Sequence, residues 1–288
     1  MRKPEAAPLA VNRSVAQSAI VPSAVTNALT SLGVQLGSLI LVHPDAIVAA
    51  QFSAAPQKAG FNNAGFSKEQ RLDLLIEAIE AAIGADGTLV MPAFSYSFTR
   101  GEPFDISNTP SVVGMVTERF RTRPSVRRTA DPIFSFAARG PLAEELCAIP
   151  VKECFGRDSA FAALHRLNAH IVDLGCSMTR GGTFVHYIET AHGVDYRYPK
   201  TFLGTVISPE GKAVNRSVVY NVRDLTRKSD ADLWRLQKRL AQDGKLRIAD
   251  VGRSRIIAMT AGDLFDTAWK MLDEDPASLI AEGAMSEP

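Results

Sequence analysis

The sequence predicts an α/β protein, a three-layer sandwich with helices on both faces of a central mixed sheet. Helix-like and strand-like segments alternate along most of the 288 residues, and no Pro/Ser-rich linker or shift in composition divides them. A hydrophobic content of 46% is enough to build one large core. We therefore expect residues 1–288 to form a single domain, with loose ends at 1–20 and 277–288.

The first half of the chain contains five segments with clear periodicity. They are, in order, a helix at 23–32, a buried strand at 38–42, a helix from 67, a strand at 88–91 and a helix from 111 to about 121. Ser67 and Gln70 match a capping box, which marks the start of the second helix. Asp86-Gly87 is typical of the turn that precedes the second strand.

The second half continues the alternation of strands and helices. We expect a strand at 133–138, short helices at 141–147 and 160–167, a strand at 170–175, a helix that contains His186, a hairpin of 202–207 and 213–220, a helix at 230–241, a strand at 256–259 and a helix at 262–272. Long loops follow several strand ends. Because α/β folds place their binding sites at such ends, we expect the functional site there.

Composition excludes several classes of partner. The net charge of +1 gives no overall attraction to nucleic acid or to a membrane surface. The chain has no apolar run of 18 residues and no signal-peptide core, so we predict a cytoplasmic protein. Its three cysteines, Cys147, Cys154 and Cys176, form no C-x-x-C pair, and we expect neither a metal site nor a disulfide.

The most informative stretch runs from Gly181 to Glu189. Two glycines follow a strand and a short polar loop, and they precede a helix with a histidine and, three residues later, a glutamate. Residues three apart share a helix face, so His186 and Glu189 can point at the same space. With Thr183 as the N-cap, His186 lies near the positive helix end, which disfavours imidazolium, while the carboxylate favours it. The pattern fits a general base; the alternative is a satisfied core histidine.

Other candidate features have two interpretations each. The arginines at 119, 121, 123, 127 and 128 match phosphate oxygens in a polyanionic small ligand, or they form a solvated helix face. Ser111 and Gly114 open a helix that could bind phosphate through backbone N–H groups, or they form a simple cap. The aromatic stretches 94–98 and 196–198 offer rings to a sugar or base, or serve in packing.

Several familiar motifs are missing from the sequence. It has no G-x-G-x-x-G, no Walker loop, no G-x-S-x-G elbow and no H-E-x-x-H. The hexapeptide repeat of β-helix acyltransferases and the Gly-rich pyrophosphate loop of GNAT acyltransferases are also missing.

From about residue 25 to 280 the chain resembles the aminoglycoside 3-N-acetyltransferase family, the antibiotic N-acetyltransferases that are neither GNAT nor hexapeptide enzymes. The ordered set that carries the likeness is Leu41-Val42-His43, Gly87-Thr88-Leu89-Val90-Met91-Pro92, Phe104-Asp105, Thr109-Pro110-Ser111 with Gly114, Glu118 and Arg121, Arg128-Thr129, Asp131-Pro132, Ser135, Gly140, Cys154-Phe155-Gly156, Leu174-Gly175, Thr183-Phe184-Val185-His186-Tyr187-Ile188-Glu189, Asp250-Val251-Gly252 and Asp275-Pro276. The resemblance implies acetyl transfer from acetyl-CoA to a sugar amine, with the helix histidine as base.

Finer details are similar to one branch, the bacterial N-acetyltransferases that act on nucleotide-linked amino-deoxy sugars of surface polysaccharides. These details are the stretches 93–98, 128–135 and 186–189 with 196–198. Two departures separate the chain from the antibiotic branch. Pro44-Asp45 follows His43 where that branch typically has serines that help to hold CoA, and Asp131 replaces a histidine before Pro132.

The resemblance implies a role for each candidate residue. His186 is the base and Glu189 orients it, in a direct transfer rather than through a cysteine acyl-enzyme. Backbone N–H groups of Gly182 and Thr183 are the candidates for the oxyanion site. The candidates for binding acetyl-CoA are His43, Ser111, Gly114, Arg127, Arg128 and Thr129. Those for binding the nucleotide-linked amino sugar are Tyr96, Phe98, Asp105, Asp131, Tyr196, Arg197 and Tyr198.

Charge supports the same branch. The loops 93–109, 121–135 and 190–200 carry seven basic and four acidic residues, which suits a diphosphate and repels a polycation. The alternatives are an aminoglycoside 3-N-acetyltransferase of antibiotic resistance, an enzyme for another nucleotide or phosphonate amine, and a non-catalytic binder of CoA or a sugar nucleotide. The oligomeric state stays open, with a homodimer as one option.

Overall fold

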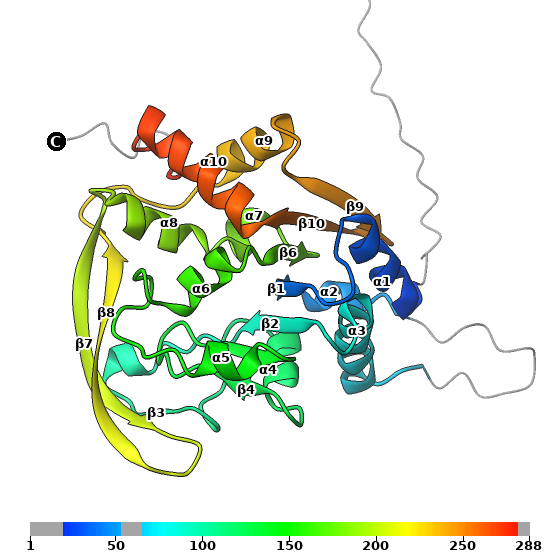
Figure 1. The fold of residues 1–288 in the computed structure, drawn as a ribbon, viewed down its shortest axis with the longest axis horizontal. Coiled ribbons are helices and arrows are strands. Elements are labelled where there is room, and N and C mark those ends of the chain that lie inside the picture. The colour runs from blue at the N-terminus through cyan, green and yellow to red at the C-terminus, as the bar shows by residue number, and fades with distance from the viewer. Residues whose placement is uncertain (1–19, 53–64, 282–288) are drawn as a thin grey trace, which may run out of the picture.

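The computed structural model describes residues 20–52 and 65–281, and its centre is a seven-stranded mixed sheet (Figure 1). The strand order is β4-β5-β2-β1-β6-β10-β9. Three parallel strands form the middle, and the outer strands are antiparallel. The bounds are β1 Leu39–Pro44, β2 Thr88–Pro92, β4 Arg127–Arg128, β5 Phe136–Arg139, β6 His170–Leu174, β9 Arg247–Val251 and β10 Ser254–Thr260.

Helices cover both faces of this sheet. One face carries α1 (Pro22–Ser31), α3 (Lys68–Ile83) and α4 (Met115–Arg121). The other carries α5 (Ala143–Cys147), α6 (Ala160–Arg166), α8 (Val185–His192), α9 (Trp234–Gln242) and α10 (Ala261–Glu274). Three short helices, α2 (Ala46–Ala49), η1 (Phe98–Arg100) and α7 (Met178–Gly181), lie in the connections. The predicted three-layer α/β sandwich with a mixed sheet is confirmed.

The buried core is divided in two by the sheet. Along β1, Leu39 and Leu41 belong to the cluster on the α8 and α10 side, while Ile40 and Val42 belong to the cluster on the α1 and α3 side. Successive side chains of a strand point to opposite faces, so a strand covered by helices on both faces is apolar throughout. This explains why residues 38–42 read as a continuous apolar run.

A second, three-stranded sheet stands at the side of the domain. It consists of β3 (Phe104–Asp105) and the long hairpin of β7 (Arg197–Ile207) and β8 (Ala213–Arg223). The hairpin is the long ribbon at the left of Figure 1, and one of its ends lies beside the end of α8. The predicted hairpin is confirmed, and both of its strands are longer than expected.

Several predicted elements differ from the structure, among them the strand expected at 133–138, which is β5 and begins at Phe136. The helix expected from Ser111 begins at Met115, because the N–H of Val112 donates to the carbonyl of Phe94 and holds the preceding residues against the end of β2. Strand β9 was not predicted; it is a polar edge strand that pairs only with β10. At the end of the described chain, Leu279 and Ile280 are buried, so residues 277–281 are not a loose end.

No helix in the described part of the chain is both long and apolar enough to cross a membrane.

Candidate active site

The segment that carries the predicted base follows the central strand β6. The chain turns at Gly175, forms the short helix α7 and then enters α8. A Cβ atom on Gly181 would lie only 2.2 Å from Asp173 Oδ1, and one on Gly182 only 2.3 Å from Leu233 Cδ1. The two glycines are therefore required by close packing of α7 against β6 and α9, and this packing fixes the start of α8.

His186 and Glu189 meet as the three-residue spacing predicts. His186 Nδ1 lies 2.8 Å from Glu189 Oε2. The Glu189 side chain is 1% exposed and that of His186 is 21% exposed, so solvent reaches the ring but hardly reaches the carboxylate. Tyr196 is fully buried, and its hydroxyl donates to Glu189 Oε1 at 3.0 Å. Both carboxylate oxygens thus have a partner.

Arg197 joins this group from the start of β7. Its Nη2 lies 2.7 Å from His186 Nδ1, and its Nε lies 2.6 Å from Glu189 Oε2. Nη1 donates to the carbonyl of Asn221 on the paired strand β8 at 3.2 Å. The side chain is only 5% exposed. The predicted dyad is therefore part of a buried cluster of four residues built by α8 and the hairpin.

Burial and charge set the protonation of this cluster. Burial lowers the pKa of His186, and the nearby charge of Arg197 lowers it further, against the opposing effect of Glu189. Burial acts to raise the pKa of Glu189, but the hydrogen bond and charge of His186 together with Arg197 outweigh it, so this pKa is lowered. At neutral pH the ring is uncharged and the carboxylate is ionised, which is the state that a general base needs.

Aromatic rings pack against His186 and against one another. Phe155 packs edge-on against the imidazole, with 5.6 Å between ring centroids, and contacts Tyr220 of β8 at 5.8 Å. Phe134 connects these rings to Tyr96, which is 40% exposed. Of these rings, only Tyr96 was predicted from the sequence to bind a ligand, and no such role was predicted for Phe134, Phe155 or Tyr220. These packed rings connect His186 to Tyr96 at the surface, and Phe134 and Phe155 between them are buried.

The expected roles of Thr183 and Gly182 have no support in the geometry. Thr183 caps no helix, because α7 ends two residues before it and α8 begins at Val185. The N–H of Gly182 donates to the carbonyl of Met178, and that of Thr183 donates to the carbonyl of Gly181. Neither N–H is free to donate to an oxyanion.

His43 belongs to a second buried pair. At the end of β1 its Nδ1 lies 3.0 Å from Oδ1 of Asp173 in the neighbouring strand β6. His43 Nε2 is buried and has no hydrogen-bond partner in the described residues. Asp173 was missed by the sequence analysis, although a charged residue in an otherwise apolar strand is the signal that could have found it. An unpartnered nitrogen at this strand end fits a site for a polar group of a ligand.

The other residues expected to bind acetyl-CoA are bonded within the protein. Glu118 accepts the N–H of Ser111, and Gly114 is the residue before α4, with φ at 136°. Thr129 is buried, and its Oγ1 accepts the N–H of Phe136 in β5. Gly114 comes close to β1, since a Cβ atom there would lie 4.0 Å from the carbonyl oxygen of Pro44.

Most arginines of this run are paired with carboxylates, and Arg128 is bonded to uncharged groups. Arg128 is buried under the loop that precedes α4 and donates to Ser135 Oγ and to the carbonyls of Ala93 and Thr109, while burial lowers its pKa to about 10. The other pairs are Arg119 with Asp73, Arg121 with Glu118, Arg123 with Asp73, Glu77 and Glu80, and Arg127 with Glu144. The charge excess predicted from the sequence is therefore mostly cancelled.

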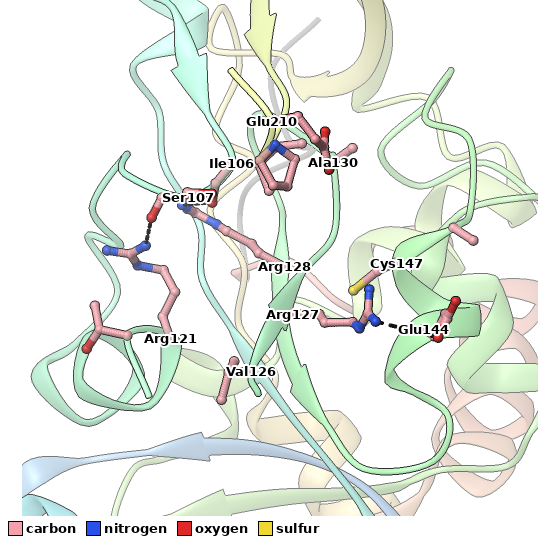
Figure 2. A pocket seen from close by; sticks show the side chains of 13 residues that line it. Ile106, Ser107, Arg121, Val126, Arg127, Arg128, Ala130, Glu144, Cys147 and Glu210 are labelled. Atoms are coloured by element: carbon pink, nitrogen blue, oxygen red, sulfur yellow. Dashed lines mark hydrogen bonds and ion pairs between the residues drawn. The ribbon is translucent and has the colours of Figure 1, made fainter. Parts of the chain in front are cut away.

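Arg121, Arg127 and Arg128 line a cavity of about 700 Å³ at the edge of the sheet (Figure 2). Figure 2 shows Arg121 beside Ser107 on one side and Arg127 beside Glu144 on the other. None of the residues that line this cavity belongs to the cluster of His186, Glu189, Tyr196 and Arg197. The cavity is thus separate from the His186 cluster, and a phosphate contact of Arg127 stays a prediction.

Several residues expected to bind the acceptor serve the fold instead. Phe98 is a core residue, and the carboxylate of Asp105 accepts the N–H groups of Ser107 and Asn108 in its own turn. Asp131 is buried, and its Oδ1 accepts the N–H groups of Ile133 and Phe134. Tyr196 and Arg197 contact Glu189 rather than solvent. Tyr198 on β7 is half exposed. An acceptor could therefore reach Tyr198 as well as Tyr96.

The cysteines are poor nucleophiles. Burial, followed by the charge of Asp131, raises the pKa of Cys154 well above its usual range. Burial and the charge of Asp173 raise the pKa of Cys176 to about 12. Both thiols are protonated at neutral pH, which supports direct transfer. No group of three potential ligands is arranged to hold a metal ion within residues 20–52 and 65–281.

Comparison with known proteins identifies a group of similar chains. A sequence model of the family described as aminoglycoside 3-N-acetyltransferase matches residues 59–273. Aminoglycoside N(3)-acetyltransferase IV of Salmonella sp is 32% identical over 262 residues, which cover 89% of this chain and 90% of that protein.

Solved structures extend the likeness to three dimensions. A histidine-to-alanine mutant of aminoglycoside acetyltransferase AAC(3)-IVa in complex with apramycin superimposes with a TM-score of 0.69 at 28% identity, over 91% of this chain and 95% of that one. The binary complex of AAC-IIIb with CoASH has a TM-score of 0.71 at 19% identity, over 88% and 97% of the two chains, and at that identity it shows the shared fold.

These relatives correct the expected function. The resemblance to enzymes of nucleotide-linked amino sugars led us to place the chain in a polysaccharide branch, and that prediction is wrong: the similar proteins are aminoglycoside acetyltransferases. The alternative of a non-catalytic binder is also rejected. The chain is an acetyl-CoA-dependent N-acetyltransferase.

Proposed function

Because the chain belongs to the aminoglycoside 3-N-acetyltransferase family, we propose that its acceptor is the 3-amino group of an aminoglycoside. One observation carries the proposal: the identity of 32% to a Salmonella enzyme of that name extends over nine-tenths of both chains. The buried cluster of His186, Glu189, Tyr196 and Arg197 supplies the base that acetylation of an amine requires.

The acceptor amine must lose a proton when its nitrogen attacks the thioester carbonyl. His186 Nδ1 is occupied by contacts to Glu189 and Arg197, which leaves Nε2 as the nitrogen for the substrate. In the transfer a C–N bond forms, the C–S bond breaks, and the proton passes from the amine to Nε2 and then to the leaving thiolate. Glu189 stabilises the imidazolium that exists between these two proton transfers.

Acetyl-CoA supplies the activated acetyl group. The residues that we propose to hold it lie at the end of β1 and in the loop before α4. His43 Nε2 is a buried nitrogen without a partner in the described residues, and Gly114 approaches the carbonyl of Pro44. Gly181 packs closely against His43 and Asp173, since an added Cβ atom there would meet both side chains.

The basic residues near the expected site do not exclude a polycationic acceptor. The sequence count opposed seven basic residues to four acidic ones, but it took every arginine as free. Arg121, Arg127 and Arg197 each pair with a glutamate, and Arg128 is buried on carbonyl groups. The rings packed between His186 and the surface are uncharged, and Tyr96 and Tyr220 are among them. Rings of this kind bind both sugar faces and ammonium groups.

A thiol-release assay tests the proposal. The purified protein is mixed with acetyl-CoA and, in separate reactions, with apramycin, gentamicin or a buffer blank, and His186→Gln serves as the inactive control. We expect CoA release that depends on the aminoglycoside, with one acetyl group added to the 3-amine by mass spectrometry and NMR. Absence of thiol release with every aminoglycoside, from a folded wild-type protein, would refute the proposed acceptor.

Cytoplasmic location and oligomeric state stay predictions. A cytoplasmic enzyme is consistent with the use of acetyl-CoA and with three free cysteines in the described chain. A homodimer is one option, and sedimentation of the purified protein would decide it.

A further inference from the structure

Two groups of opposite charge contact the same nitrogen of His186. Glu189 Oε2 lies 2.8 Å from Nδ1, and Arg197 Nη2 lies 2.7 Å from it. A protonated Nδ1 can donate to the carboxylate, whereas only an unprotonated Nδ1 can accept from the guanidinium, which has donors alone. The two contacts therefore cannot both be hydrogen bonds at one time.

We propose that Arg197 is a positioning residue, which competes with Glu189 for Nδ1 and thereby keeps His186 uncharged between turnovers. The proposal rests on the proposed function, in which His186 is the base. Arg197 acts in two ways. Its Nε also lies 2.6 Å from Glu189 Oε2, so the carboxylate divides its charge between the ring and the guanidinium. Formation of imidazolium would also place a second cation within 2.7 Å of Nη2.

The surroundings leave little else to offset Arg197. The ring contacts Glu189 of α8, Arg197 at the start of β7 and the uncharged ring of Phe155 in the loop before α6. The charge of Arg223 on β8 acts on it from further away, while Tyr196 contacts Glu189 and Tyr220 contacts Phe155. Arg223, the register partner of Arg197, is paired with Asp230, which offsets its charge. Arg197 is therefore the cation in direct contact with the ring, and Glu189 is the carboxylate that it shares with His186.

Arg197 also selects between the two neutral forms of the ring. When it donates to Nδ1, the ring proton is on Nε2, and the resting ring cannot accept a proton there. When Glu189 accepts from Nδ1, the lone pair of Nε2 is free for the acceptor amine. Arg197 thus keeps the ring uncharged, but it lowers the population of the reactive tautomer, which carries its proton on Nδ1. Catalysis proceeds through the molecules in which Nδ1–H donates to Glu189.

A ¹⁵N NMR titration of the histidine side chains tests this competition without any substrate. The chain has five histidines, and His186→Gln identifies the signals of His186. The spectra report both the pKa and the protonated nitrogen. The variants are Arg197→Gln, which removes the charge and the fork, and Arg197→Lys, which keeps the charge alone. The matched control is Arg255→Gln, an exposed arginine paired with Asp250 at the far edge of the sheet.

In the wild type we expect the neutral ring to carry its proton on Nε2. Arg197→Gln should raise the pKa of His186 by about one unit and move the proton to Nδ1. The acid limb of kcat/KM should move to higher pH by the same amount. Arg197→Lys should move the proton to Nδ1 with a smaller pKa shift, and Arg255→Gln should change neither.

An unchanged pKa of His186 and an unchanged tautomer in Arg197→Gln would overturn the proposal. A lower plateau in the pH profile of kcat/KM, with the same pKa and tautomer, would assign Arg197 a merely structural role. If Arg197→Gln fails to fold, the tautomer in Arg197→Lys decides. The NMR shift without thiol release from any aminoglycoside would refute the proposed acceptor and leave this inference standing.

Discussion

Replacement of Gly181 by alanine tests the packing that positions the base. The added Cβ would lie 2.2 Å from Asp173 Oδ1 and 3.2 Å from His43 Cβ. A carbon–oxygen contact of this kind needs about 3.2 Å, so one partner must move by about 1 Å. Asp173 is held between two paired strands and by His43, so the movement falls on α7 and the start of α8.

The size of the effect follows from that displacement. Misplacement of a catalytic group by 1 Å costs about 10²-fold in rate, and overpacking costs about 1–3 kcal/mol in the free energy of unfolding. We expect losses of this order in kcat/KM by thiol release and in urea denaturation.

Two further variants separate this clash from other effects of the substitution. Gly65→Ala is the matched control, since its nearest atom is 3.8 Å away and its φ is not positive. Gly181→Ala with Asp173→Ala removes the obstacle and should recover part of the rate. A Gly181→Ala protein with wild-type activity and stability would refute the reasoning.

The remaining predictions concern the base and the buried arginine. His186→Gln should lower turnover by about 10²–10⁴-fold with an unchanged melting curve; near-normal turnover would remove the residue from the mechanism. The base works when neutral, and the pKa of His186 is lowered, so kcat/KM should fall only as the pH drops below the ordinary histidine pKa of about 6.5. A fall in kcat/KM that begins above this pH on the acid side of the profile would contradict the assignment of His186 as the base. Arg128→Ala leaves the buried carbonyls of Ala93 and Thr109 without a donor and should lower the free energy of unfolding by about 3 kcal/mol in urea titration. Replacement of the exposed Arg127 by alanine should change it by less than about 0.5 kcal/mol. Equal effects of the two substitutions would contradict a stabilising role of the Arg128 hydrogen bonds.

The features that could be predicted from the sequence are those set by residues close to one another along the chain. The pairing of His186 with Glu189 follows from helical spacing, and the buried strands follow from continuous apolar runs. The hairpin followed from two strand-like segments around a turn. These features need no knowledge of how distant segments dock.

What sequence could not predict depends on distant contacts. Tyr196 and Arg197 read as ligand-binding residues because their partner Glu189 is on another element. The arginine run reads the same whether its charges are free or paired, and only the fold brings Asp73 and Glu144 to it. Charge counting therefore favoured the wrong acceptor.

The hairpin of β7 and β8 holds two regions of the molecule at opposite ends of one ribbon. Arg197 and Arg223 form the end at the base, while Pro209 and Glu210 at the turn border the cavity of Figure 2. Eleven paired positions at about 3.3 Å per residue separate these ends by about 33 Å. Insertions or exchanges at the turn leave the pairing near Arg197 in register, since residues beyond the turn need not shift. A change at the turn would therefore alter the border of the cavity without altering the contacts of Arg197 with the base.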